Sequence, residues 1–377
     1  MKICLVGFDN LPVLVREYCQ QTVGGESVQQ TLLARALSRR GHEVCMVTAD
    51  YGQADEAVWE QIRVHKAYRP GAGIPVLRFI HPRWTGIWGA LARADAQLYY
   101  TSCAGMHVAL LALFCARYAR RFVFRAASDA DCDPTRLLVR YARDRWLYRY
   151  GLRRADAILV QSAVQAGSLA GKFGLDSRMA GMLVEPAPRD VERNIDVLWV
   201  GNIRRVKRPD RILSLSAELP EVGFHMVGGP LPDEGALFHT TRRAAMLRPN
   251  ITFHGRLSYQ DTNALYGRAR LLINTSDVEG FPNSYLQAWV RGVPVVSYVD
   301  PDGIIRRHGL GVVVESALEM RAAIERLLAD TGALAAASAR CQAYVAREFT
   351  EDKILAPYLA TFDEVLREGD GSSRVPA

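Results

Sequence analysis

The stretch SDVEGFPNSYLQAWVRGVPVV, residues 276–296, follows an apolar strand pattern at residues 271–274 and places polar groups around the start of a helix. Asn283 or Ser284 is the expected N-cap of that helix. The segment GVPVV at residues 292–296 ends the helix and begins the next strand. This strand, loop, helix and strand are typical of a parallel α/β unit with polar groups at a strand end.

The carboxylate of Glu279 and the amide of Gln287 are the two polar side chains of this stretch that most suggest a ligand. Glu279 lies in the loop, and Gln287 lies eight residues later on the helix. We expect both to face one ligand, because the helix start lies between them. A loop carboxylate and an ordinary helical glutamine are the alternative interpretation.

The rest of the chain repeats the same alternation of strands and helices. Strands are expected at residues 3–6, 43–48, 98–101, 122–125, 157–160, 196–200, 223–227 and 251–254, and helices at 27–40, 209–217 and 261–266. The charged, proline-containing segment VEPAPRDVERN at residues 184–194 predicts an interdomain linker. The pattern therefore indicates two doubly wound domains with parallel sheets, and it contains no dinucleotide-binding glycine fingerprint.

Composition excludes several classes of protein. The chain has 377 residues, of which 49% are hydrophobic, enough for two full cores. Its seven cysteines are scattered without zinc spacing, which predicts a reducing cytoplasm and no structural metal. The N-terminus resembles a first strand and not a signal peptide, and the longest apolar run, residues 104–116, is too short to span a bilayer. We expect a protein that is soluble or peripheral to a membrane.

Positive charge is concentrated in one region. Residues 117–154 contain eleven arginines and four aspartates, a net charge of +7 that equals the formal charge of the whole chain. A helix predicted over residues 134–150 places Arg136, Arg140 and Arg143 on one side. This predicts a basic face for anionic lipid headgroups or a phosphate-bearing acceptor, with a solvated helix as the alternative. No nucleic-acid recognition module is apparent, so we expect no nucleic acid partner.

Two further segments are candidates for phosphate contacts. Gly24 and Gly25 precede a helix, so backbone N–H groups can approach a ligand there, although a flexible turn explains them equally well. The segment VGNIRRVKRPD at residues 200–210 follows a strand and concentrates cations just before a helix. Those cations predict neutralisation of a diphosphate, with a solvated charged surface as the alternative.

Together, these segments resemble the retaining glycosyltransferases of family 4. The similar blocks are GGESVQQTLLARALSRRGHEV, ADAILVQS, VGNIRRVKRPD, FHGRLSYQDTNALYGRARLLINTS and EGFPNSYLQAWVRGVPVV, in the order of that family, and the resemblance runs from Met1 to about Phe362. It implies the GT-B architecture, in which two Rossmann-like domains face each other across a cleft.

The resemblance also implies a division of the chain. Residues 1–184 are the expected acceptor-binding domain, 185–194 the linker, 195–345 the nucleotide-sugar-binding domain, 346–368 a C-terminal helix packing back toward the N-terminal domain, and 369–377 a disordered tail.

By the same resemblance, Glu279 lies beside the donor sugar and Lys207 contacts the diphosphate. The other implied donor-binding residues are Gly24, Gly25, Asn202, Arg204, Arg205, Gly255, Arg256, Leu257, Gly280, Phe281, Pro282, Asn283, Ser284 and Gln287.

Three positions depart from the family pattern. Gln287 stands where the family has a second glutamate that binds the ribose, and an amide has only one acceptor oxygen. Asn202 stands where an arginine is usual, with Arg204 or Arg205 able to compensate. Ala126 stands where many members have a histidine, and Asp129, with Asp131 and Asp133 close by in sequence, is the expected replacement.

These inferences predict a retaining, metal-independent hexosyltransferase that needs no cofactor beyond its nucleoside diphosphate sugar. We expect it in the cytoplasm, peripheral to the inner face of the membrane, acting on a lipid-linked glycan of surface polysaccharide assembly. A nucleotide-sugar-binding pseudoenzyme and a sugar epimerase or phosphorylase on the same architecture are the alternatives. The donor base and sugar, the acceptor and the oligomeric state are not determined by these patterns.

Overall fold

The computed structural model describes residues 1–19, 23–75, 77–188, 191–231 and 234–371, with the side chains of residues 369–371 left aside. Its chain forms two compact units. The first unit comprises Met1–Tyr18, Gly25–Leu183 and Glu351–Ala377, and the second comprises Cys19–Gly24 and Val184–Thr350.

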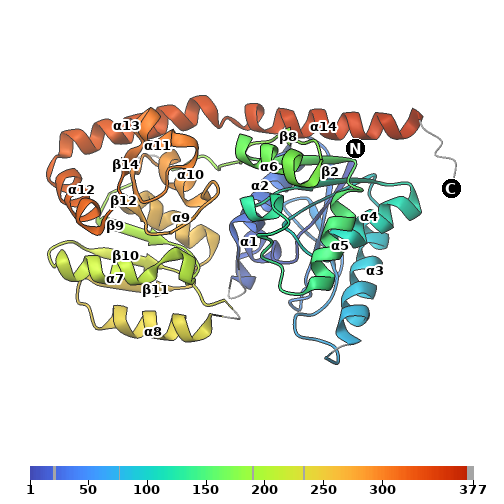
Figure 1. Cartoon of the computed structure of the whole chain (residues 1–377), viewed down its shortest axis with the longest axis horizontal. Helices are drawn as coiled ribbons and strands as arrows, with labels where there is room; N and C mark the ends of the chain where they lie inside the picture. The colour runs from blue at the N-terminus through green and yellow to red at the C-terminus, as the bar shows by residue number, and fades with distance from the viewer. Residues whose placement is uncertain (20–22, 76, 189–190, 232–233, 372–377) are drawn as a thin grey trace. The chain divides into compact units, whose positions relative to one another are not determined.

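The first unit is built on one sheet with helices on both faces (Figure 1). Within the described residues the sheet has eight strands in the order β3-β4-β2-β1-β5-β6-β7-β8. Their bounds are β1 Lys2–Val6, β2 Glu43–Thr48, β3 Ala57–Trp59, β4 Ile62–Lys66, β5 Leu98–Ser102, β6 Arg121–Arg125, β7 Ala157–Val160 and β8 Arg178–Met179. Neighbouring strands pair in parallel except β3 and β4, so the parallel sheet expected from the sequence carries one antiparallel edge strand.

The helices of the first unit follow the strands. They are α1 Leu11–Leu14, α2 Gly25–Arg39, α3 Thr85–Ala94, α4 His107–Tyr118, α5 Ala142–Leu152, α6 Ala163–Phe173 and α14 Glu351–Gly371. Short helical turns occur at η1 Arg16–Tyr18, η2 Leu77–Phe79, η3 Ile80–Trp84 and η4 Asp129–Cys132.

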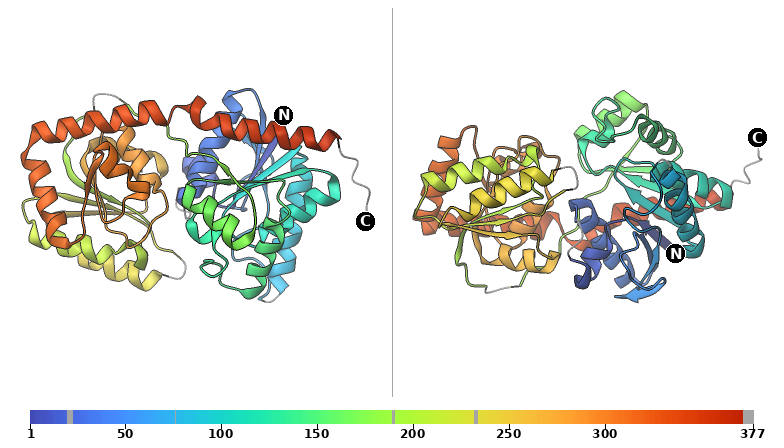
Figure 2. Two further views of the ribbon diagram at one scale, coloured as in Figure 1. Left: turned by 45° about the horizontal axis from the view of Figure 1, so that its top comes forward. Right: turned by 90° about the horizontal axis from the view of Figure 1, so that it is seen from below.

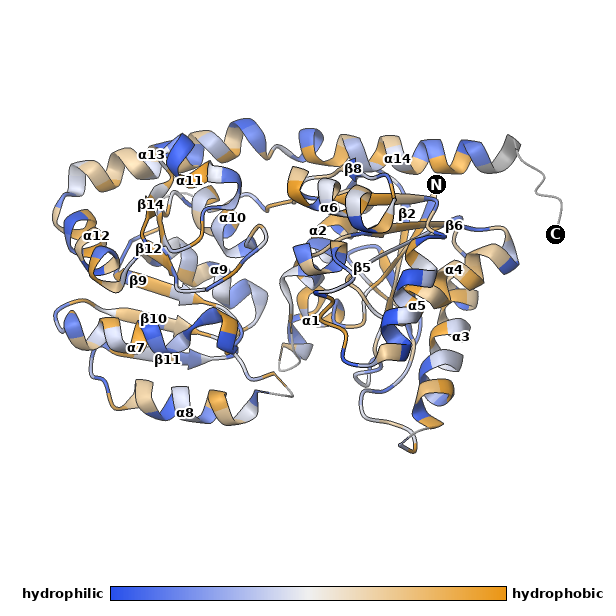
Figure 3. Ribbon diagram, in the orientation of Figure 1, coloured by the Kyte–Doolittle hydropathy of each residue, from blue (hydrophilic) through white to orange (hydrophobic). Residues whose placement is uncertain are grey.

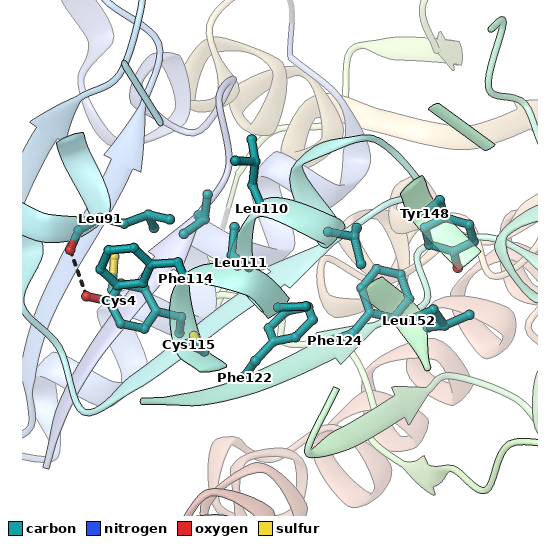
Figure 4. Close-up of a cluster of buried hydrophobic side chains, with 14 of the residues drawn as sticks. Cys4, Leu91, Leu110, Leu111, Phe114, Cys115, Phe122, Phe124, Tyr148 and Leu152 are labelled. Atoms are coloured by element: carbon teal, nitrogen blue, oxygen red, sulfur yellow. Dashed lines mark hydrogen bonds between the residues drawn. The ribbon is translucent and has the colours of Figure 1, made fainter. Parts of the chain in front are cut away.

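The core of the first unit lies between its sheet and the helices α3, α4 and α5. Aromatic side chains from β5, β6 and α4 meet there, among them Tyr99. Figure 4 shows Phe114 and Phe122 in this cluster. The Tyr99 hydroxyl donates to the Leu91 carbonyl oxygen at 2.7 Å, which gives this buried phenol a partner.

The C-terminal helix α14 belongs to the first unit. Its buried side chains, which include Tyr358 and Phe362, recur at helical spacing, and the helix packs against α2 and β6. The Tyr358 hydroxyl donates to the Gly181 carbonyl at 2.9 Å, and Arg178 forms an ion pair with Glu364. The C-terminal helix was expected to begin at residue 346, but residues 349–350 are not helical and α14 begins at Glu351. The tail expected from residue 369 lies outside the described residues from 372 onward.

The helix predicted over residues 134–150 is wrong in its first half. The helix α5 begins at Ala142, after an extended Tyr141. The Asp133 carboxylate accepts hydrogen bonds from the Thr135 N–H and hydroxyl at 2.9 and 2.7 Å, and such local bonds compete with helix formation. Arg136 and Arg140 therefore precede the helix.

The second unit has its own parallel sheet. Within the described residues it has six strands in the order β11-β10-β9-β12-β13-β14. Their bounds are β9 Ile195–Val200, β10 Phe224–Val227, β11 Ile251–Gly255, β12 Ala269–Asn274, β13 Val295–Ser297 and β14 Gly311–Val313, and every pairing is parallel.

Helices cover both faces of this second sheet (Figure 2). They are α7 Pro209–Glu218, α8 Gly235–Met246, α9 Tyr259–Arg268, α10 Asn283–Val290, α11 Ile304–His308, α12 Ala317–Ala329 and α13 Thr331–Glu348, with turns at η5 Arg205–Lys207 and η6 Pro301–Gly303. Both units therefore confirm the expected doubly wound architecture. No helix in the described part of the chain is long and apolar enough to cross a membrane.

Candidate functional site

The loops after β9 and β12 meet at the carboxyl edge of the second sheet, because these two strands are neighbours. The Asp277 N–H donates to the Val206 carbonyl at 2.9 Å, and the Thr275 hydroxyl donates to the Lys207 carbonyl at 2.7 Å. In open parallel sheets this edge is the usual place for a ligand. Two segments that are far apart in sequence therefore form one surface.

Glu279 and Lys207 form an ion pair at this edge. Glu279 Oε1 also accepts from the Ser276 hydroxyl at 2.7 Å and from Asn274 Nδ2 at 3.3 Å. No described residue donates a hydrogen bond to Oε2. The side chains of Lys207 and Glu279 are 24% and 12% exposed. The carboxylate is thus held in place through one of its two oxygens.

The arginines next to Lys207 differ in whether they already form ion pairs with carboxylates. Arg208 has a positive φ of 48° and forms ion pairs with both Asp210 and Asp277. Among the described residues, neither Arg204 nor Arg205 makes an ion pair, although the Arg205 backbone N–H donates to Glu234 at 3.5 Å. These two arginines are the cations in this loop best able to receive an anionic ligand.

The helix α10 begins differently from the sequence prediction. Pro282, and not Asn283 or Ser284, is its N-cap, and no side chain caps it. Pro282 has extended backbone angles, so the helix starts at Asn283 itself. An N-terminus without a side-chain cap retains its partial positive charge, which favours an anion. Gly280 and Phe281 lead into it, and the Phe281 ring packs against Trp289 at 6.2 Å.

Gln287 is buried and has partners inside the second unit. Its Nε2 donates to the Tyr259 hydroxyl at 3.2 Å, and its Oε1 accepts from Arg291 Nη1 at 3.0 Å. Burial lowers the pKa of the Arg291 guanidinium. The sequence analysis did not identify Tyr259 or Arg291, because nothing in a linear pattern indicates which side chains surround a buried amide.

The ends of β10 and β11 continue this edge. A Cβ on Gly228 would lie 2.1 Å from the Gly201 carbonyl oxygen, so only glycine allows these two loops to approach so closely. Arg256, between Gly255 and Leu257, donates to the Pro230 carbonyl at 2.6 Å. On the β9 side, Asn202 Nδ2 donates to the Val23 carbonyl at 3.1 Å, which brings the residue before Gly24 to this edge of the second unit.

In the first unit, the three candidate aspartates after β6 have different roles. Asp131 closes a capping box with Ser128, accepting the Ala127 and Ser128 N–H groups at 2.9 and 3.1 Å, and burial raises its pKa to about 6. Asp133 is paired with Lys172. Asp129 is partly exposed and accepts from Gln165 Nε2 at 3.0 Å. Asp129 is therefore the aspartate least committed to the fold.

A buried ion pair lies at the same edge of the first sheet and was not predicted. Arg125, at the end of β6, is fully buried, and its Nη1 donates to both carboxylate oxygens of Glu26 at 2.9 and 3.1 Å. Glu26 follows Gly25 in the first turn of α2. No described residue provides an acceptor for Arg125 Nε or Nη2. The only sequence signal was an arginine at the end of the apolar strand RFVFR.

Two doubly wound units, with an oriented carboxylate and cations at the strand ends of the second, fit the GT-B class of folds. Residues 194–330 match the family described as glycosyl transferases group 1, and residues 24–180 match the glycosyl transferase 4-like domain. The chain belongs to this glycosyltransferase family, as its sequence blocks indicated.

Several solved structures have the same fold as this chain. Sucrose-phosphate synthase from Thermosynechococcus elongatus superimposes with a TM-score of 0.75 at 18% identity, covering 97% of this chain and 99% of that chain. HepE from Anabaena, in complex with UDP and glucose, gives 0.71 at 16% identity over 96% and 99%. WaaG, a glycosyltransferase of lipopolysaccharide biosynthesis, gives 0.67 at 15% identity over 95% and 98%. A search of curated proteins finds no match.

Proposed function

We propose that this glycosyltransferase transfers a hexosyl group from a UDP-sugar to a hydroxyl acceptor, with retention of configuration and without a metal ion or other cofactor. The observation that carries the proposal is Glu279, which Lys207 and Ser276 hold through Oε1 while no described residue donates a hydrogen bond to Oε2. HepE, which has the same fold, has been solved with UDP and with UDP-glucose. UDP-glucose is therefore the first donor to test.

In the proposed reaction, the acceptor oxygen forms a bond to the anomeric carbon on the face from which the diphosphate leaves. The bond between that carbon and the β-phosphate oxygen breaks, and the acceptor proton passes to a phosphate oxygen of the departing UDP. Lys207 and Arg204 stabilise the negative charge that develops there. One such preorganised donor contributes roughly a hundredfold to a thousandfold in rate.

Glu279 and Asp129 have binding roles in this proposal. Glu279 Oε2 accepts hydrogen bonds from donor sugar hydroxyls, while the ion pair with Lys207 holds the carboxylate in place. Asp129 is proposed to position the transferred sugar, as the family resemblance implied, and its partial exposure after β6 is compatible with that role. The donor-binding surface includes the α10 N-terminus and the segment Gly255–Leu257, whose backbone borders the same sheet edge.

We further propose a lipid-linked glycan acceptor of surface polysaccharide assembly and a location on the cytoplasmic face of a membrane. Seven free cysteines are compatible with a reducing compartment. The first unit carries the basic region that contains Arg136, Arg140 and Arg143. An acceptor with a phosphate-linked lipid would bring negative charge to that region.

A nucleotide-sugar-binding protein without turnover is the second candidate. Gln287 favours it, because its amide is engaged by Tyr259 and Arg291 and offers no carboxylate to a ribose. An epimerase or phosphorylase on the same fold would also bind a nucleotide or a sugar phosphate at this edge.

UDP release from UDP-glucose by the purified chain, with and without chelator, tests the proposal. We expect slow hydrolysis that chelator does not change and an α-configured glucose as the first product, detected by NMR. UDP should raise the melting temperature more than GDP or ADP. Stabilisation by UDP with no hydrolysis and no transfer to any glycolipid acceptor would favour the non-catalytic candidate, and loss of activity with chelator would contradict metal independence.

A further inference from the structure

The segment before α3 exposes apolar side chains that the fold does not cover. Ile74, Leu77 and Ile80 each leave more than half of their surface in solvent. Residues 70–84 contain Arg78 and Arg83 and no acidic residue. Isolated exposed apolar residues are common, but a cluster of them marks an interaction surface.

A second segment has the same character. Leu138, Tyr141 and Trp146, which lie before and within α5, are 75%, 50% and 62% exposed. Trp146 stacks on Tyr150 with ring centroids 5.6 Å apart, so its exposed indole is supported from one side. Figure 3 shows hydrophilic positions along α5 and hydrophobic positions in the segment that leads into α3.

These two segments meet through Arg143. Its guanidinium carbon lies 3.4 Å from the centre of the Phe79 ring and 5.9 Å from that of Tyr141. Phe79 lies between the exposed residues Leu77 and Ile80, so the two segments form one surface. We name it the apolar-basic surface, comprising the apolar residues Ile74, Leu77, Ile80, Leu138, Tyr141 and Trp146 with the arginines Arg136, Arg140 and Arg143.

The charge of this surface is largely uncompensated. Residues 134–154 contain seven arginines and one aspartate, Asp144, which pairs with Arg143 at 2.8 Å. Within the described part of the chain, Arg136 and Arg140 are exposed and form no ion pair. The surface therefore combines exposed aromatic and aliphatic side chains with arginines that lack a counter-charge.

We propose that the apolar-basic surface docks the first unit on an anionic lipid bilayer. A bilayer interface satisfies both features, because aliphatic and aromatic side chains enter the headgroup region while arginines meet lipid phosphates. This inference rests on the proposed function, since a lipid-linked acceptor would reach the first unit from the same membrane. It adds the segment before α3 as the part that inserts, with the arginines around Arg136 supplying electrostatic attraction.

Cosedimentation of the full chain with vesicles of phosphatidylcholine and phosphatidylglycerol tests the docking. Ile74→Ser, Leu77→Ser and Ile80→Ser together should lower the partition coefficient at least tenfold. Arg136→Ser with Arg140→Ser should lower it roughly 25-fold at low salt, because each arginine near the surface contributes about fivefold. High salt should reduce the binding of the wild type but not the effect of the apolar substitutions.

The helix α8 supplies matched controls. Arg242 and Arg243 are exposed there, as are Met246 and Leu247. Arg242→Ser with Arg243→Ser, and separately Met246→Ser with Leu247→Ser, should leave vesicle binding unchanged. Unchanged melting temperatures would show that every variant is folded.

UDP-glucose hydrolysis without vesicles is measured on the apolar variant and on the α8 controls and should equal the wild type, because none of these residues is assigned to donor or acceptor binding. Absence of hydrolysis in the wild type would contradict the proposed function, but vesicle binding could still be measured and would test the docking separately. The docking would be overturned if the wild type did not sediment with anionic vesicles at low salt, or if the α8 controls lost as much vesicle binding as the other variants. It would also be overturned if the apolar variant bound vesicles normally while soluble polyphosphate displaced the protein from them. The last result would identify a site for soluble polyanions.

Discussion

Lys207→Ala separates a catalytic role for the lysine from a structural one. The Lys207–Glu279 pair is partly exposed, and such pairs contribute about 1 kcal/mol to stability. Glu279 keeps Ser276 and Asn274 as donors after the substitution, so the fold should tolerate it. Loss of a cation that stabilises a leaving diphosphate instead costs about 3 kcal/mol in the transition state, or roughly 150-fold in kcat/KM.

The assay is UDP release from UDP-glucose over a range of donor concentrations, with the free energy of unfolding measured by denaturant titration. Lys172→Ala is the matched control, because Lys172 also pairs with a carboxylate, that of Asp133, but is not among the residues that form the donor edge of the second sheet. We expect a similar small loss of stability in both variants and a rate loss only in Lys207→Ala. A rate close to wild type in Lys207→Ala, or an equal loss in the control, would refute the assignment of Lys207.

Three further substitutions test the remaining residues. Glu279→Gln keeps the shape but removes the charge, so kcat for UDP release should fall at least tenfold, whereas near-wild-type kinetics would make Glu279 structural. Gln287→Glu places a carboxylate beside Arg291. It should raise the free energy of unfolding by about 1 kcal/mol, because a hydrogen bond between opposite charges replaces one to a neutral acceptor. A lower melting temperature of the variant would contradict that placement. Asp131 has a pKa raised by burial to about 6, so its protonation favours the folded state as the pH falls from 7 toward 5. Between pH 7 and pH 5, the free energy of unfolding of the wild type should rise by about 1 kcal/mol relative to that of Asp131→Asn, as measured by denaturant titration. A difference that does not change with pH would show that Asp131 titrates normally.

Much of the fold was predictable from local patterns. The expected strands and the principal helices appear with boundaries that shift by at most a few residues, because apolar runs and turn residues define buried parallel strands. The clearest failure is the first half of the helix expected over residues 134–150, where the Asp133 carboxylate binds Thr135 and diverts the backbone. The N-cap at Pro282 is a smaller error of the same local kind.

The candidate site was predictable as residue types at strand ends, but its contacts were not. Lys207 and Glu279 were each selected for a separate contact with the donor, and the structure adds that they bind each other. Gln287 was read as a departure from a motif, and its burial against Tyr259 and Arg291 adds a reason why an amide is stable there.

The sequence by itself determined the two doubly wound domains and the glycosyltransferase family, because strand and helix periodicities and motif spacing are local properties of the chain. Only the tertiary structure decided which polar groups meet. Lys207 and Glu279 are 72 residues apart, and Glu26 and Arg125 are 99 apart. Such pairs depend on the order of strands in each sheet. That order places β9 beside β12 and leaves β5 between β1, which precedes α2, and β6, and it is set by packing of the whole core.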